Sequence, residues 1–133
     1  MHDSTTVETD GSIAVHDVTS QVEDCVPSSA DGVCVVSVRH TTAAIVLNEA
    51  ETGLLDDIES MVRSIVPDGP YEHDRIDDNA EAHLVSVLLG ESAVVPLVDG
   101  DLALGTWQSV LLIEADGPRR RTIDVTVLGG AAD

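Results

Sequence analysis

Valine-rich runs of strand length stand on both sides of two helical stretches, and this order constrains the fold more than any other feature. The runs are 33–39, 42–48, 92–98, 109–115 and 121–128. β-Branched side chains favour a pleated surface, so each run predicts a strand. Residues 50–66 and 80–89 instead repeat their apolar residues at the helical period. Strands grouped around helices predict an α+β fold, with an antiparallel sheet or β-sandwich that carries the helices.

Shorter elements complete a single domain over residues 1–133. They are strands at 4–10, 12–16 and 102–104 and a helix at 17–26. The dipeptide Asp99-Gly100 predicts a hairpin turn between the strands that flank it. Pro96 cannot donate to a ladder, so it predicts a bulge or a strand near the edge of a sheet.

The core of this domain must be aliphatic. Tyr71 and Trp107 are the only residues of the Phe, Tyr and Trp class, while 43% of the chain is hydrophobic. The two cysteines, Cys25 and Cys34, form no C-x-x-C pair, and we expect both to be small buried hydrophobes.

The charge of the chain restricts its partners and its location. Asp and Glu number 25 against six Arg and no Lys, which gives a formal net charge of -19. Such a chain repels nucleic acids and anionic membranes, so we expect neither as a partner. The carboxylates are spread between apolar runs, which predicts an acidic surface rather than an acidic tail. The N-terminus lacks a signal-peptide pattern and no apolar run approaches ~20 residues, so the expected location is the cytoplasm.

Three histidines stand in polar surroundings on three different elements. His40 lies at a strand end, His73 in a loop and His83 in a helix. Convergence of the three would make a metal site of the zinc type with one open position. The alternative is that each is an independent surface or capping residue. His2 and His16 have no such surroundings and are expected to be exposed.

Three further clusters have two interpretations each. Polar residues at both ends of the strand 42–48, namely Thr41, Thr42, Asn48 and Glu49, indicate either a site or a strand end followed by a helix cap. The turn Gly105-Thr106-Trp107-Gln108 forms either a ligand-binding wall or a turn whose indole fills the core. Glu114 is either a buried acid or a surface residue.

The run Arg119-Arg120-Arg121 holds half of the positive charge of the chain. Arginine suits bidentate binding of phosphate or carboxylate, so this run predicts an anion site. The alternative is a loop that forms salt bridges with acidic neighbours or with a partner subunit. The sequence contains no G-x-G-x-x-G, P-loop or G-x-S-x-G motif, which argues against hydride transfer, nucleotide hydrolysis and serine esterase chemistry.

Taken in order, these clusters resemble the YjbQ-like family from about residue 33 to 130. The matching segments are H-T-T-A-A-I-V-L-N-E at 40–49, V-P-D at 66–68, Y-E-H at 71–73, N-A-E-A-H at 79–83, L-G-T-W-Q at 104–108 and R-R at 120–121. One departure is the loop after Glu114, where the family carries a histidine-containing loop and this chain has only Ala-Asp-Gly-Pro. The resemblance therefore implies no role for that loop.

The resemblance implies a jelly-roll-like sandwich with two to three helices and a homotrimer whose site lies near the subunit junction. It also implies that His40, His73 and His83 converge on a divalent metal, with zinc the expected ion. Members of the family are labelled secondary thiamine-phosphate synthases, after a weak condensation of a phosphorylated thiazole with a pyrimidine pyrophosphate.

Two functional hypotheses follow. In the first, the chain is a metal-dependent enzyme that acts on a phosphorylated small metabolite. Its catalytic residues are then His40, Glu49, His83, Trp107, Gln108 and Glu114. Its substrate-binding residues are Thr41, Thr42, Asn48, Ser86, Gly105, Thr106, Arg120 and Arg121. In the second, the chain is a non-catalytic trimeric module that binds a metal or an anionic metabolite; a third interpretation has the polar clusters only joining subunits.

The acidic composition predicts a salt-dependent fold, as in a protein from a salt-loving organism. In molar salt, charges more than roughly 3 Å apart are screened, so self-repulsion becomes tolerable. We expect the chain to lose its circular-dichroism signal of folded structure on dialysis from molar KCl into low salt. Unchanged stability at low salt would contradict this.

Overall fold

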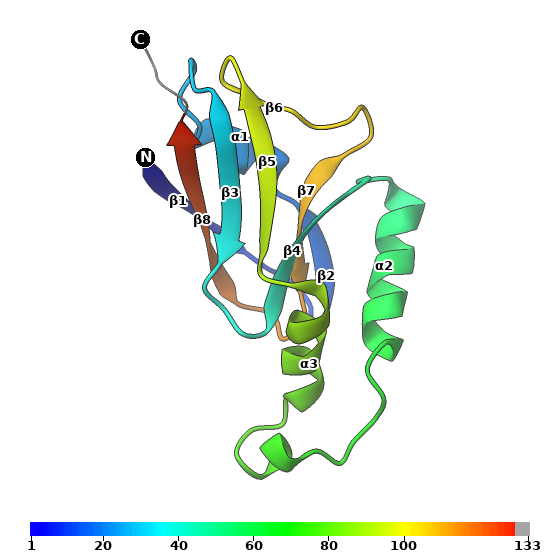
Figure 1. The fold of residues 1–133 in the computed structure, drawn as a ribbon. Helices are drawn as coiled ribbons and strands as arrows, with labels where there is room; N and C mark the ends of the chain where they lie inside the picture. The colour runs from blue at the N-terminus through cyan, green and yellow to red at the C-terminus, as the bar shows by residue number, and fades with distance from the viewer. Residues whose placement is uncertain (130–133) are drawn as a thin grey trace.

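The computed structural model describes residues 1–129, which form eight strands, three α-helices and one 3₁₀-helix (Figure 1). The strands are β1 (His2–Glu8), β2 (Ala14–Asp17), β3 (Gly32–Val38), β4 (Ala43–Asn48), β5 (Ser92–Val98), β6 (Asp101–Leu102), β7 (Ser109–Glu114) and β8 (Arg120–Gly129). The helices are α1 (Thr19–Asp24), α2 (Thr52–Ser64), η1 (Glu72–Arg75) and α3 (Ala80–Leu89). Within residues 1–129, no helix is long and apolar enough to cross a membrane.

The strands form two antiparallel sheets that pack face to face. The larger sheet has the order β1-β8-β3-β5-β6 and the smaller one the order β2-β7-β4. Between them lies an aliphatic core to which Val36 and Val125 contribute from the larger sheet and Ile45 and Leu112 from the smaller one. Val22 of α1 joins the same core. The predicted α+β fold and β-sandwich are thereby confirmed.

Helices α2 and α3 cover the outer face of the smaller sheet (Figure 1). Their Val62 and Val85 pack with Ala44 and Ile113 in a second apolar cluster. Strand β7 is therefore buried on both faces, which explains why it reads as an uninterrupted apolar run rather than an alternating one. It is the central strand of its sheet, and the polar clusters described below lie near its two ends.

The predicted elements match the structure to within a few residues. The helix at 80–89 has the bounds predicted for it, and the helix at 50–66 is shorter at both ends because α2 begins after Glu51. The carboxylate of Glu51 caps this helix by accepting the N–H groups of Gly53 and Leu54, at 2.6 and 3.0 Å. The helix cap is therefore Glu51 and not Glu49. The 3₁₀-helix η1 forms around His73, a residue that the sequence places in a loop.

Local turn chemistry is also as expected. Asp99 and Gly100 have φ angles of 50° and 82°, as a tight hairpin turn requires. A Cβ at Gly100 would lie 2.2 Å from the carbonyl oxygen of Ser28, so only glycine fits. The carbonyl oxygen of Pro96 accepts from the N–H of Ala103, which follows the two-residue edge strand β6. The nitrogen of Pro96, which has no hydrogen to donate, faces the same short edge of the sheet. Cys25 and Cys34 are buried and free, as predicted.

Candidate functional site

A polar hollow of about 360 Å³ opens at the end of the sandwich where β4 and α3 begin. Its walls carry arginine, histidine, carboxylate and hydroxyl side chains. They are Arg39, His40, Thr41, Thr42, Asp77, Asn79, His83, Asp116, Arg119 and Arg121. We call this space the polar hollow.

Antiparallel pairing brings these residues together from four parts of the sequence. Ala43 pairs with Glu114 across β4 and β7, and Val38 pairs with Ile123 across β3 and β8. The end of β3, the start of β4, the end of β7 and the start of β8 therefore meet at one edge of the sandwich. Helix α3 supplies the remaining wall.

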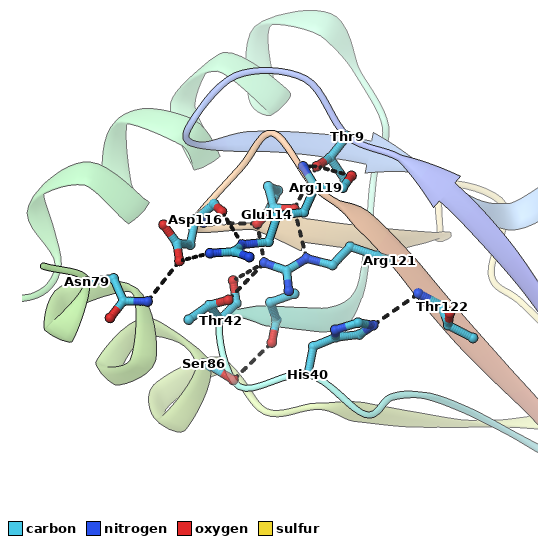
Figure 2. A network of polar contacts seen from close by, with 11 residues as sticks. Thr9, His40, Thr42, Asn79, Ser86, Glu114, Asp116, Arg119, Arg121 and Thr122 are labelled. Carbon is cyan, nitrogen blue, oxygen red and sulfur yellow. Dashed lines mark hydrogen bonds and ion pairs between the residues drawn. The ribbon is translucent and has the colours of Figure 1, made fainter. Parts of the chain in front are cut away.

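A buried ion pair lies at the base of the hollow (Figure 2). Arg121 is 3% exposed and Glu114 is fully buried. Two bonds join them, from Nε to Oε1 at 2.8 Å and from Nη2 to Oε2 at 2.5 Å. Thr9 and the backbone N–H of Asp116 also donate to the carboxylate, at 2.7 and 2.9 Å. Burial alone would raise the pKa of Glu114, but hydrogen bonds from Arg121 and Thr9 hold it below its usual range.

Arg121 also ties the network to the start of β4. Its Nη2 donates to the carbonyl and hydroxyl oxygens of Thr42, at 3.1 and 2.9 Å. Within residues 1–129 its Nη1 makes no hydrogen bond, although the guanidinium lines the polar hollow. One face of this guanidinium is thus locked by the protein and its remaining nitrogen is available to a ligand.

A second ion pair forms the rim of the polar hollow. Arg119 donates from Nη2 to the Oδ2 of Asp116 at 2.8 Å and from Nε to its carbonyl oxygen at 2.7 Å. The Nδ2 of Asn79, in front of α3, donates to the same Oδ2 at 2.8 Å. Burial would raise the pKa of Asp116, but the bonds from Asn79 and Arg119 lower it. The shortened loop after Glu114 therefore supplies two wall residues.

A third arginine reaches the hollow from the end of β3. Arg39 donates from Nε and Nη2 to the two oxygens of Asp124, at 2.9 and 3.1 Å. The Asp124 side chain is buried, whereas that of Arg39 is 80% exposed. The Nε2 of His2 lies 3.4 Å from the same carboxylate.

His40 is held by the backbone of β8. The N–H of Thr122 donates to its Nε2 at 3.0 Å (Figure 2). Burial lowers the pKa of His40, and the nearby positive charge of Arg121 lowers it further. Both effects favour the neutral ring.

His83 stands between the polar hollow and two neighbouring ones. Its ring centroid lies 4.6 Å from that of His73, with the rings edge to face. One neighbouring hollow, of about 360 Å³, is lined by His40, Thr41, His83, Ser86, Val87 and Glu91. The other, of about 460 Å³, is mostly apolar and is lined by Tyr71, Glu72, His73, Ala80, His83 and Leu84. We call the latter the apolar hollow. A separate cavity of about 150 Å³ between α2 and α3 contains none of the predicted site residues.

The structure thus brings together one half of the predicted site. His40, His83, Thr41, Thr42, Ser86 and Arg121 line the hollows described above, and His73 contacts His83. Ser86 donates its hydroxyl to the carbonyl of Ala43 at 2.9 Å. Glu114 is buried beneath Arg121 with both oxygens engaged, which suits a residue that positions Arg121 rather than an acid or base.

The other half lies elsewhere. Asn48, Glu49, Gly105, Thr106, Trp107 and Gln108 gather at the opposite end of the small sheet. Asn48 pairs with Ser109 there, five residues along β7 from Glu114, or about 17 Å. Trp107 is 72% exposed, so it does not fill the core, and Gln108 accepts from Gly105 within the turn. Within one chain these residues do not meet the histidines.

Two other expectations need correction. Arg120 points away from the hollow and pairs with Glu8 at 3.2 Å, because side chains on a strand alternate and Arg121 faces inward. His16 was expected to be exposed but is largely covered, with Nε2 3.5 Å from the carboxylate of Asp10. His2 is exposed as predicted.

The three imidazoles do not form a metal site in this arrangement. Within residues 1–129, no three His, Cys, Asp or Glu side chains are grouped closely enough to hold one ion. His40 Nε2 accepts from the N–H of Thr122, so in a neutral ring Nδ1 carries the proton and neither nitrogen has a free lone pair for a metal. As arranged, His40, His73 and His83 therefore do not fit zinc or another divalent metal, and no chemical step proposed below passes through one. Metal binding by these histidines stays a prediction.

Several wall residues had not been recognised in the sequence. Arg39, Asn79 and Asp116 each stand next to or inside a segment that had been singled out. Arg39 directly precedes His40, and Asn79 opens the segment N-A-E-A-H. Their position next to a polar motif is the sequence feature from which these wall residues can be predicted.

Comparisons with known proteins give one consistent result. A family model described as UPF0047 protein YjbQ-like matches residues 3–130. A UPF0047 protein of Archaeoglobus fulgidus is 51% identical over 92% of this chain and 98% of its own. A UPF0047 protein of Methanothermobacter thermautotrophicus is 50% identical over 85% of this chain and 81% of its own. The crystal structure of a hypothetical protein from Aeropyrum pernix K1 superimposes with a TM-score of 0.92 at 44% identity, over 98% of this chain and 99% of the other.

The buried ion pair predicts a pH-dependent contribution to stability. Replacing Glu114 by Gln leaves Arg121 buried without a charged partner, which should cost about 3–5 kcal/mol of unfolding free energy. Because the pKa of Glu114 is lowered on folding, its contribution is complete above the unfolded value of about 4.3 and is lost as the pH falls through the folded value. Urea unfolding at constant KCl should therefore show the gap between wild type and Glu114→Gln shrinking below about pH 4.

The exposed pair of Arg120 on β8 and Glu8 on β1 is the matched control. Arg120→Gln should cost less than about 1 kcal/mol, because exposed pairs contribute little. The double replacement Glu114→Leu with Arg121→Met should recover much of the loss. A Glu114→Gln variant as stable as wild type would show that the pair is not a buried charge pair in solution.

Proposed function

The chain belongs to the UPF0047 YjbQ-like family, and from the residues of its polar hollow we propose that it is an enzyme that binds a phosphorylated small metabolite there and acts on it. The observation that carries the proposal is the placement of positive charge. The chain has six arginines and no lysine at a net charge of -19, and three of the six line this one hollow. This gathering of half of the few cations at one place supports an anion site there.

Each of the three arginines is oriented by a carboxylate behind it. Asp124 holds Arg39, Asp116 holds Arg119 and Glu114 holds Arg121. A guanidinium has five N–H donors, so two or three bonds to a carboxylate or a carbonyl leave others for a ligand. The carboxylates therefore fix the positions of the guanidinium groups and leave some of their N–H donors unused. Fixing them reduces the side-chain entropy lost when a ligand binds.

A phosphate group matches this wall. Two of its oxygens can accept the two parallel N–H bonds of one guanidinium. It carries up to two negative charges, and when fully ionised it only accepts hydrogen bonds. Thr41 adds an exposed side chain beside the arginines. The acidic surface of the rest of the chain would repel any anion, so binding here depends on these short-range contacts and on salt that screens the remaining charge.

His83 is the residue that we propose for proton transfer. It lines the polar hollow and both of its neighbours. Its ring nitrogens make no hydrogen bond within residues 1–129, so either is free to take up or deliver a proton. A metabolite whose phosphate lies against Arg119 and Arg121 would place its remaining atoms beside this ring.

The thiamine-phosphate synthase label is one specific form of this proposal. That condensation would bring a phosphorylated ring and a pyrophosphate leaving group into the polar hollow, where the arginines would neutralise the developing charge. The apolar hollow beside Tyr71 and Leu84 offers room for a ring.

We also propose that the chain assembles as a homotrimer through the outer face of the larger sheet. Val35 pairs with Val94, and Val33 lies between Pro96 and Leu128. Val94, Val98 and Leu128 are all well exposed, although the open face of an antiparallel sheet is usually polar. In Figure 1 α2 and α3 lie on the other side of the molecule. Contiguous exposed apolar side chains of this kind are typical of protein interfaces.

Phosphate binding tests the role of the arginines. In molar KCl, inorganic phosphate should raise the melting temperature of the wild type, because it binds only the folded state. Arg119→Gln should reduce this rise, whereas Arg120→Gln should leave it unchanged, since Arg120 lies one residue away on the opposite face. Equal shifts in the two variants would remove the polar hollow as the binding site.

Turnover then separates an enzyme from a binding module. Phosphorylated metabolites that give the largest thermal shifts are incubated with the wild type and with His83→Asn, and products are followed by ³¹P NMR. We expect turnover by the wild type alone, with phosphate binding retained in both. Binding without turnover in the wild type would favour the non-catalytic alternative.

The proposed interface predicts a change of oligomeric state. Light scattering should give a trimer for the wild type and monomers for Val94→Asp, because a charge would be buried at the contact. Ile76→Asp changes an apolar residue that is even more exposed than Val94 but lies in the loop before α3, and this variant should remain trimeric. A monomeric wild type, or a trimeric Val94→Asp, would contradict the proposal.

A further inference from the structure

Two histidines of the site are locked by hydrogen bonds whose direction is unambiguous. We propose that His40 and His73 are held as opposite neutral tautomers, so that the site offers an N–H donor at His40 Nδ1 and a lone pair at His73 Nδ1 to one ligand. The inference rests on the proposed function for the identity of that ligand as an oxyanion.

The tautomer of His40 follows from its bond to the backbone. A main-chain N–H can only donate, so the Nε2 that it meets at 3.0 Å must carry a lone pair. In a neutral ring the proton is then on Nδ1. Burial and the charge of Arg121 both disfavour a second proton. Within residues 1–129, Nδ1 has no partner, and the residue lines two of the hollows.

The tautomer of His73 follows from a chain of three groups. The amide of Asn79 donates its Nδ2 to the carboxylate of Asp116, which as an anion can only accept. The amide orientation is thereby fixed, and its Oδ1 is the atom that faces His73 at 3.0 Å. Because that oxygen only accepts, His73 Nε2 carries the proton. In a neutral ring the lone pair is then on Nδ1, and this atom has no partner within the described residues.

These assignments define the class of ligand more closely. The polar hollow presents donors to the ligand from Arg39, Arg119 and His40, which suits an oxyanion that only accepts. His73 lines the apolar hollow and has an acceptor to offer, with His83 between the two spaces. We therefore expect a phosphate ester whose apolar part bears an O–H or N–H group. The volume of the apolar hollow, about 460 Å³, is large enough for a ring.

The same argument gives His40 a role other than metal ligation. Its Nε2 lone pair is already shared with Thr122, so a metal at that atom would leave a backbone N–H unpaired. Donation from Nδ1 to a phosphate oxygen needs no such change. The residue is thus a donor that contacts substrate, and Asn79 is a positioning residue for His73.

Nitrogen NMR tests the proposal directly. In a ¹⁵N–¹H multiple-bond spectrum of the full chain in molar KCl, each imidazole shows which of its nitrogens is protonated. We expect a protonated Nδ1 for His40 and a protonated Nε2 for His73, with His40→Gln and His73→Gln used for assignment. The reverse tautomer at either ring, or a rapid mixture at both, would overturn the proposal. The tautomers themselves are read from the spectrum of the wild type, and the two variants serve only to identify which signals belong to His40 and His73.

Two additions extend the test to the ligand. Inorganic phosphate should shift the Nδ1 proton of His40, whereas zinc should leave its Nε2 resonance unchanged; loss of that resonance on zinc binding would overturn the assigned role. Asn79→Ala should release His73 into a mixture of tautomers and leave His40 as in the wild type. A single unchanged tautomer of His73 in this variant would show that Asn79 does not position it.

The outcomes separate this inference from the proposed function. If the tautomers are as assigned but phosphate shifts no resonance of the site, the proposed function fails and the tautomers stand. If phosphate binds at Arg119 but His40 carries its proton on Nε2, the inference fails and the proposed function stands. His40→Ala should weaken phosphate binding roughly tenfold, as expected for the loss of one bond to a charged group.

Discussion

The ion pair between Arg121 and Glu114 is the interaction on which the rest of this site depends. Both charges are removed from water, and they are tolerated because each oxygen of Glu114 has two donors while Arg121 is bonded through Nε and Nη2. Their partners come from the loop after β1, the start of β4 and the loop after β7, namely Thr9, Thr42 and Asp116. The pair therefore closes the end of the sandwich and sets the base of the polar hollow at the same time.

Positive charge in this chain is scarce and concentrated. Three of six arginines line one hollow, each with a carboxylate behind it. In a chain of net charge -19, an arginine without such a partner would be drawn to any of many acidic neighbours. Fixed carboxylates at Asp124, Asp116 and Glu114 hold the guanidinium groups at the hollow. Half of the positive charge of the chain thus lies at one place in an otherwise acidic protein.

Hydrogen bonds, more than proximity, decide what the histidines can do. His73 and His83 are in contact, and His40 and His83 share two hollows. That arrangement alone would suggest a metal site. The backbone of Thr122 and the amide of Asn79 occupy one nitrogen each on His40 and His73, which leaves the other nitrogen of each ring without a partner in the described residues.

The sequence by itself determined the local elements, the aliphatic core and the residues from which a site is built. Helix 80–89, the five long strands and the polar segments at 40–42 and 79–83 all follow from periodicity and residue type, because these are local properties. Only the tertiary structure decided which of the segments meet. The register of β4 with β7 places His40 and Glu114 at one end and Asn48 and Trp107 at the other, and strand alternation turns Arg121 inward and Arg120 outward. Strand register, and the face of the sheet on which a side chain lies, depend on pairing between residues that are far apart in the sequence. Residues that look equally polar in the sequence are therefore separated by the length of a strand.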